Sequence, residues 1–179
     1  MQVPVRKGDK VPRPKADPFM TAAKFRELEA KLHKWKTINR PREAAEVERL
    51  ALMGDFSENT GYQVAKGRLR GLNQRILDTE NLLARAEIIT TDNDTDQVRL
   101  GHYVTIEDLG AVGQSEKQQK TYQILGSAET NPATGVISHN SPLGMALLGR
   151  RLGDIVAIGL SGKTKKYKIV KIDNFKNLL

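Results

Sequence analysis

The chain reverses direction at Gly54-Asp55-Phe56-Ser57-Glu58-Asn59-Thr60-Gly61-Tyr62, which separates two long segments with helical periodicity. A glycine is typical of a helix end, and Ser57 can cap the next helix because its hydroxyl accepts from a backbone N–H of the first turn. We therefore predict a helical hairpin over residues 19–89 with its tip at 54–62. The carboxylates of Asp55 and Glu58 are three residues apart, so both can point outward from the end of this rod.

The segment before the turn has apolar residues every three or four positions, as one face of a helix requires. Thr21 is a possible N-cap for this helix. Pro41 cannot donate to the preceding turn, so we expect a kink or short interruption near Asn39 to Pro41. The apolar positions before the proline are Phe25, Leu28, Leu32 and Trp35.

The segment after the turn has the clearest periodicity in the chain. Its apolar seam is typical of a coiled coil and needs a partner helix, which the tight turn supplies as an antiparallel neighbour. A helix from Ser57 to Glu87 would be roughly 46 Å long. The seam positions are Tyr62, Ala65, Leu69, Leu72, Ile76, Thr79, Leu83 and Ala86.

Residues 90–96 are polar and acidic, and we interpret them as a linker. Beyond them the periodicity becomes that of strands, with one short helix expected where Ser141 caps and Pro142 takes the first helical position. The sequence thus predicts an α+β fold: an N-terminal antiparallel coiled-coil helical hairpin and, over 97–179, an antiparallel sheet with one short helix.

Composition narrows the possible functions. The chain has no cysteine, which excludes disulfides, thiol catalysis and cysteine-based zinc sites, and its three histidines are too scattered for a metal site or a catalytic triad. A net charge of +8 favours an anionic partner such as nucleic acid. No segment is long and apolar enough for a membrane span or a signal core, so we expect no membrane contact and a cytoplasmic protein.

Basic residues surround the acidic tip. Residues 1–18 form a basic, proline-rich tail, either an electrostatic arm or a solvated extension. The tip acids have two interpretations as well, because carboxylates near a helix N-terminus also offset the macrodipole. Basic side chains near the tip could contact RNA phosphates or the wall of a channel. These candidates are Arg49, Lys66, Arg68 and Arg70.

Two separated segments resemble the bacterial GreA/GreB transcript-cleavage factors. They are MGDFSENTGY at 53–62, with Arg40-Pro41 upstream, and ISHNSPLGMALLG at 137–149, followed by Gly153-Asp154. The resemblance runs from about Phe19 to Ile172. It implies a hairpin that enters the secondary channel of bacterial RNA polymerase and an FKBP-like C-terminal domain, over 97–179, that docks at the channel rim.

The resemblance also implies a chemistry. In that family the tip acids, here Asp55 and Glu58, help the polymerase bind a second magnesium ion, and the backtracked RNA 3′ end is then hydrolysed. We expect Asp55 to help hold the ion and Glu58 to orient or deprotonate the attacking water. The isolated protein would hold no metal, and it would be a monomeric accessory to the polymerase rather than a free-standing enzyme.

Several residues depart from the family pattern. Gly61 stands where many relatives carry an acid, Phe56 and Thr60 are unusual, and the basic tail is longer than is common. Two alternatives therefore stay open. One is a channel-binding regulator that inhibits without cleavage. The other is an FKBP-type folding helper, which would use an aromatic-lined pocket; the aromatic residues available in this half are Tyr103, Tyr122, Tyr167 and Phe175.

Overall fold

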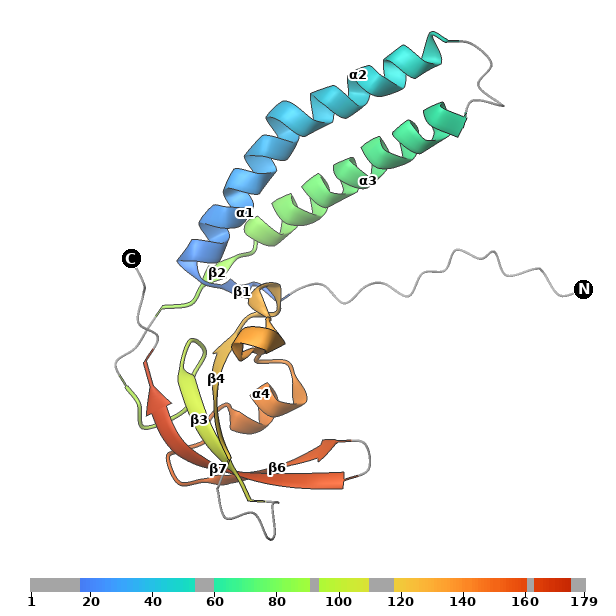
Figure 1. The fold of residues 1–179 in the computed structure, drawn as a ribbon. Helices are drawn as coiled ribbons and strands as arrows, with labels where there is room; N and C mark the ends of the chain where they lie inside the picture. Colours follow the sequence, from blue (N-terminus) through green and yellow to red (C-terminus); the bar gives the residue numbers. More distant parts are fainter. Residues whose placement is uncertain (1–16, 54–59, 91–93, 110–117, 161–162, 175–179) are drawn as a thin grey trace, which may run out of the picture.

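The computed structural model describes residues 17–53, 60–90, 94–109, 118–160 and 163–174. Within them, a helical hairpin projects from one end of a domain built on a β-sheet (Figure 1). This arrangement confirms the predicted α+β fold. No helix in these ranges combines the length and the apolar character that crossing a lipid bilayer requires.

The first arm of the hairpin begins at a helix cap. Thr21 has extended backbone angles, and its hydroxyl accepts from the backbone N–H of Lys24 at 3.1 Å, which confirms the predicted cap. The arm then runs as one bent rod (Figure 1). Its elements are β1 (Phe19–Met20), α1 (Ala22–Lys34), the π-helical turn η1 (Trp35–Asn39) and α2 (Arg40–Ala51).

The π-helical turn is the interruption that Pro41 predicts, displaced by about one turn. A proline ring collides with the carbonyl four residues earlier, here that of Thr37, so the distortion falls before the proline rather than at it. The backbone N–H of Arg40 bonds to the carbonyl of Trp35 instead of using the usual helical partner.

The second arm, α3 (Thr60–Leu83), packs antiparallel against the first. Its predicted seam is the face turned inward: Ala65 and Ile76 are buried, and the other six seam residues are half-buried. No residue of α1 or α2 is fully buried. The hairpin is therefore a thin rod, and the apolar seam of its second arm faces the first arm.

The helix expected to reach Glu87 ends four residues earlier, and this part of the prediction was wrong. Glu87 belongs instead to β2 (Glu87–Ile88), which pairs in parallel with β1. The N–H of Glu87 donates to the carbonyl of Pro18 at 2.8 Å, and that of Ile89 to the carbonyl of Met20 at 2.9 Å. The two ends of the hairpin are thereby fastened side by side at its base.

The C-terminal domain contains a five-stranded sheet with the order β5-β4-β3-β7-β6. The expectation of a wholly antiparallel sheet was wrong for one pair, because β4 and β5 are parallel. The two short 3₁₀ turns between them carry the chain back across instead of forming a hairpin. The strands are β3 (Tyr103–Asp108), β4 (Gln119–Leu125), β5 (Val136–Ser138), β6 (Ile155–Leu160) and β7 (Lys163–Asp173), and the turns are η2 (Ser127–Glu129) and η3 (Pro132–Thr134).

The short helix α4 (Pro142–Leu147) covers one face of this sheet. Ser141 caps it as predicted, since its hydroxyl accepts from the N–H of Gly144 at 3.0 Å. Leu147 is fully buried, which is worth about 1.5–3 kcal/mol for a side chain of this size. The helix contributes Leu147 to the buried core of this domain, which consists of Val98, Val104, Ile106, Ile124, Leu147, Val156, Ile169 and Ile172.

Candidate functional site at the far end of the hairpin

The helix ends that flank residues 54–59 lie at the end of the hairpin farthest from the C-terminal domain (Figure 1). α2 ends at Ala51 with Leu52 as its C-cap, and α3 begins at Thr60. Asp55 and Glu58, the predicted catalytic and metal-binding acids, lie outside the described residues. Their proposed roles therefore remain predictions.

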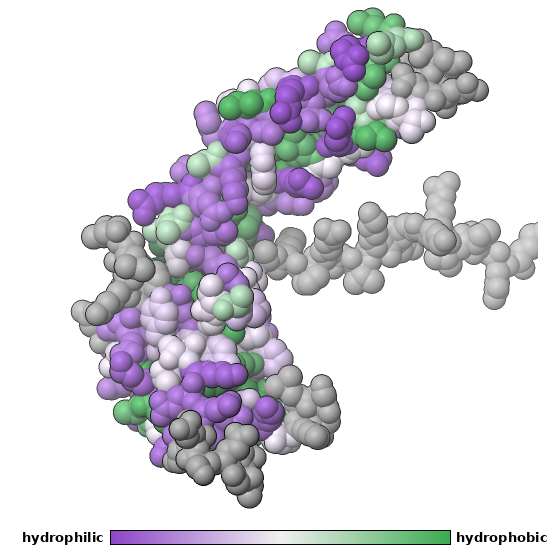
Figure 2. Space-filling model, viewed as in Figure 1, coloured by the Kyte–Doolittle hydropathy of each residue, from purple (hydrophilic) through white to green (hydrophobic). Residues whose placement is uncertain are grey.

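Exposed apolar side chains lie beside this site. Leu52 is 82% exposed and Met53 is 68% exposed at the end of α2, and Val64 on α3 is 53% exposed. Figure 2 shows the arms as mostly hydrophilic, with hydrophobic residues gathered at the far end. Burial of such side chains against another surface would be favourable.

Arg49 is the predicted basic residue nearest the end of the first arm. Its guanidinium donates to both carboxylate oxygens of Glu46, with Nε–Oε2 at 2.9 Å and Nη2–Oε1 at 2.8 Å. These hydrogen bonds lower the pKa of Glu46 and raise that of Arg49, so both groups are charged at neutral pH. Exposed pairs of this kind contribute little to stability, so Arg49 can exchange this partner for an incoming anion at little cost.

Arg68 crosses from α3 to α2, where its Nε lies 3.5 Å from Oε2 of Glu43. Arg49, Arg68 and the unpredicted Arg42 line one open hollow of about 490 Å³, together with Ala45 and two glutamates. Three guanidinium groups against two carboxylates give the hollow a small positive charge. We name these six residues the arginine hollow: Arg42, Glu43, Ala45, Glu46, Arg49 and Arg68.

The other two predicted basic residues lie elsewhere. Lys66 places its ammonium 5.7 Å from the ring centre of Tyr62, a cation–π arrangement. Arg70 is one turn further along α3 and shares that flank, whereas Arg68 lies on the opposite flank of the seam. The structure thus brings Arg49 and Arg68 together and keeps Lys66 and Arg70 apart from them.

Sequence reasoning missed Arg42 and the pairing partners of the arginines. The spacing of Glu46 and Arg49, three residues apart on a helix, is a signal that could have indicated their ion pair. The contact between Arg68 and Glu43 depends on the register of the two arms, which no local spacing reveals. Within the described ranges, no three histidine or acidic side chains are grouped to hold a metal ion.

The second cavity bears on the folding-helper alternative. It has a volume of about 90 Å³ and includes Tyr122 and Tyr167, while Tyr103 points to the other face of the sheet and Phe175 lies outside the described residues. Burial, with a smaller effect of the Asp108 carboxylate, raises the pKa of Tyr167. The walls are mainly charged or polar, unlike the apolar pocket that a proline ring needs; the other lining residues are Ile106, Asp108, Gln118, Lys120 and Lys165.

Comparison with known protein families accounts for both halves of the chain. Residues 18–88 match the family model described as transcription elongation factor, N-terminal, and residues 93–174 match that of transcription elongation factor GreA/GreB, C-terminal. The chain belongs to the GreA/GreB family. Membership makes it a transcription elongation factor of the GreA type.

Curated GreA/GreB relatives align over most of their length. The GreA proteins of Macrococcus caseolyticus and Lactococcus lactis are each 36% identical to this chain, and that of Staphylococcus saprophyticus is 38% identical. Each alignment covers 86% of this chain and 94–96% of the relative. All three are called transcription elongation factor GreA.

Solved structures of the GreA/GreB family have lower sequence identity to this chain. GreA factor homolog 1 (Gfh1) of Thermus thermophilus is 25% identical, with a TM-score of 0.38 over 87% of this chain and 97% of that one. A GreA/GreB factor from Nitrosomonas europaea is 22% identical, with a TM-score of 0.38 over 72% of this chain and 93% of that one.

Proposed function

We propose that this protein binds bacterial RNA polymerase, inserts its hairpin into the secondary channel and stimulates the polymerase to cleave backtracked RNA. The observation that carries the proposal is the match of both halves of the chain to GreA/GreB models, with the acidic pair in the segment that joins the two arms. Cleavage would create a new RNA 3′ end in the polymerase active site and allow elongation to resume. The protein acts as an accessory, and the polymerase performs the reaction.

The shape of the hairpin supports this role. α3 alone has 24 residues and is therefore about 36 Å long. A rod with an apolar seam and mostly hydrophilic outer faces can enter a narrow, water-filled passage without aggregating (Figure 2). The arginine hollow and the flank carrying Lys66 and Arg70 offer positive charge to an RNA backbone.

The donor chemistry of the tip fits magnesium in part. Carboxylate oxygens are ligands that magnesium prefers, but the ion needs about six oxygens, so Asp55 and Glu58 alone cannot hold it firmly. When bound jointly with the polymerase, the ion would stabilise charge on the reacting phosphate and lower the pKa of a bound water. Asp55 would provide an oxygen ligand, and Glu58 would orient the attacking water or accept its proton.

A second candidate is a factor that occupies the channel and slows transcription without cleavage. Gly61, exposed in the first turn of α3, favours it, because the resemblance to GreA/GreB factors leads us to expect an acid there. A glycine lowers the negative charge beside the tip. The two core acids remain in the sequence, and they favour cleavage.

Stalled polymerase carrying end-labelled RNA distinguishes the two candidates. The wild-type protein should shorten the RNA from its 3′ end, and Asp55→Asn or Glu58→Gln should slow this by about 100-fold or more while leaving binding unchanged. Asp78→Asn is the matched control, since Asp78 is an exposed acid on α3 that accepts from Gln74. RNA that keeps its length while nucleotide addition slows would favour the inhibitor instead.

A further inference from the structure

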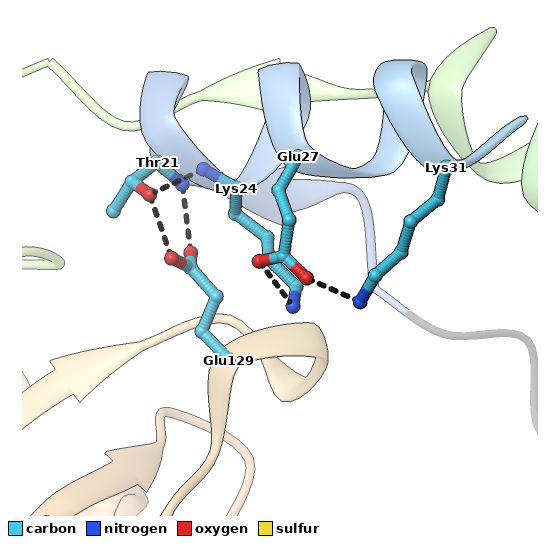
Figure 3. Close-up of polar contacts among 5 residues, drawn as sticks. All are labelled: Thr21, Lys24, Glu27, Lys31 and Glu129. Atoms are coloured by element: carbon cyan, nitrogen blue, oxygen red, sulfur yellow. Dashed lines mark hydrogen bonds and ion pairs between the residues drawn. The ribbon is translucent and has the colours of Figure 1, made fainter. Parts of the chain in front are cut away.

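A carboxylate of the C-terminal domain caps the first helix of the hairpin. Glu129, at the end of η2, accepts from the backbone N–H of Thr21 at 2.8 Å and from the Thr21 hydroxyl at 2.6 Å (Figure 3). The Thr21 hydroxyl accepts in turn from the N–H of Lys24. One threonine thus links the first turn of α1 to a residue 108 positions away.

The surroundings of these hydrogen bonds between Glu129 and Thr21 strengthen them. Thr21 is only 4% exposed, so its hydroxyl and its N–H are shielded from competing water. The Glu129 carboxylate also lies at the N-terminus of α1, where the helix dipole favours negative charge. Hydrogen bonds to an ionised group are roughly twice as strong as neutral ones.

A second carboxylate makes the same kind of contact in the opposite direction. Asp17, just before β1, accepts from the backbone N–H of Ser127 at 2.8 Å, and from Nδ2 of Asn140 at 3.5 Å. Each side of the joint therefore supplies an acid to backbone donors of the other. The Phe19 ring meets the ring of His139 edge-on, with centroids 5.5 Å apart.

The backbones at this joint are in close contact. A Cβ added to Gly126 would lie 1.8 Å from the carbonyl oxygen of Phe19, so only glycine fits there. Because β1 is paired with β2, the restraint on the first arm also acts on the end of the second. We name Asp17, Thr21, Gly126 and Glu129 the capped joint.

Small rotations at the capped joint become large displacements at the far end of the hairpin. With α3 about 36 Å long, a tilt of about 10° at the base moves that end by about 6 Å. Catalytic groups must be held to within about 0.5 Å of their productive geometry. The joint is therefore the place where the direction of the rod is determined before it meets a partner.

We propose that Glu129 is a positioning residue for transcript cleavage, which aims the hairpin by capping Thr21 across the domain boundary. This inference rests on the proposed function for its role in cleavage. Without the cap, the hairpin samples several directions, and only the fraction that points correctly can enter the channel. Because only this fraction can bind, the apparent affinity for the polymerase falls, while the rate of cleavage in the bound complex stays unchanged.

The direction of the hairpin can be measured in the free protein. Because the chain has no cysteine, Asn73→Cys on α3 and Thr164→Cys on β7, both at exposed positions, accept spin labels selectively. The labelled parent should give one narrow distance distribution. Glu129→Ala in that background should broaden it by about 3 Å, the displacement that a 10° tilt gives at Asn73, which lies about 15 Å from the base end of α3.

Cleavage assays then test the role in the reaction. Glu129→Ala should raise the concentration of factor needed for half-maximal cleavage about tenfold, the equivalent of one charge-assisted hydrogen bond, with the same rate at saturation. Asp55→Asn should show the reverse pattern. Thr21→Ser keeps both donors and should match the wild type in both measurements.

Each outcome decides the proposal. An unchanged distance distribution in Glu129→Ala, a loss of saturating rate without a change in half-maximal concentration, or a Thr21→Ser variant as defective as Glu129→Ala would overturn it. If Glu129→Ala loses helical structure, Glu129→Gln replaces it in the test. Glutamine keeps one acceptor oxygen, so this variant should broaden the distance distribution by less than the alanine variant would. If the wild type stimulates no cleavage, the proposed function fails, and the distance measurement still decides whether Glu129 fixes the direction of the rod.

Discussion

Replacing Ile76 by alanine tests whether the seam alone holds the hairpin together. Ile76 is 6% exposed and is one of two fully buried residues on α3. The change removes three carbon atoms, worth about 0.8 kcal/mol each, or about 2.4 kcal/mol in total. A thin rod lets water reach the gap, so the cost should stay near the lower end of the usual range of about 2–5 kcal/mol.

The single tryptophan provides the assay. Trp35 lies half-buried in η1, so its fluorescence reports on the hairpin, whereas the C-terminal domain contains only tyrosine and phenylalanine as fluorophores. Urea unfolding followed at Trp35 should give a free energy of unfolding lower by about 2.4 kcal/mol for Ile76→Ala.

Leu77→Ala is the matched control, because its side chain is adjacent and 51% exposed. It should change the free energy of unfolding by less than about 0.5 kcal/mol. Equal losses for the two variants would refute the reasoning, since they would mean that the seam is not where the stability of the hairpin resides.

Two other predictions concern acid stability and packing. The hydrogen bonds with Arg49 lower the pKa of Glu46 below its ordinary value of 4.5, so the stabilising contribution of Glu46 is present above that value and is lost as the pH falls through the lowered pKa. Between about pH 6 and about pH 3, Glu46→Gln should therefore lose less hairpin stability than the wild type, as measured by Trp35 fluorescence. An equal loss in the two proteins would contradict this prediction. Gly144→Ala would place a Cβ 2.2 Å from the carbonyl oxygen of Ser138, and it should destabilise the C-terminal domain by about 1–3 kcal/mol, measured by tyrosine near-ultraviolet circular dichroism, with the exposed Met145→Ala as control.

Local chemistry in the sequence was sufficient for the elements that depend on near neighbours. Thr21 and Ser141 were recognisable as caps because a hydroxyl just before a helical segment meets free N–H groups within three residues. The α3 seam was predictable because its repeat continues without a break, and the burial of Ala65 and Ile76 confirms it.

Features that depend on distant partners were not predictable in this way. The end of α3 was placed too late because the residues after Leu83 have helical periodicity, but pairing with β1 takes Glu87 out of the helix. The parallel pairing of β5 follows from the path of η2 and η3, which the alternation of apolar residues cannot indicate. Glu129 gave no local sign of its role because Thr21 is 108 residues away.

The sequence predicted which residues lie near the candidate site better than it predicted how they are arranged. Arg49 and Arg68 could be named as basic side chains near the tip, but only the register of the arms places them in one hollow with Arg42. The resemblance to GreA/GreB factors named Asp55 and Glu58, and the family membership agrees with that resemblance. Their roles in cleavage await the assay described above.

The π-helical turn also fixes the angular orientation of everything beyond it. A turn with a bond from Arg40 to Trp35 contains one residue more than an α-helical turn, and each residue rotates a helix by about 100°. If Trp35–Asn39 had regular α-helical bonds with no residue removed, α2 would be rotated by about that angle about its own axis. Arg42 and Arg49 would then leave the side of the rod that Arg68 occupies, so the π-helical bonding decides whether the guanidinium groups of the two arms share one surface.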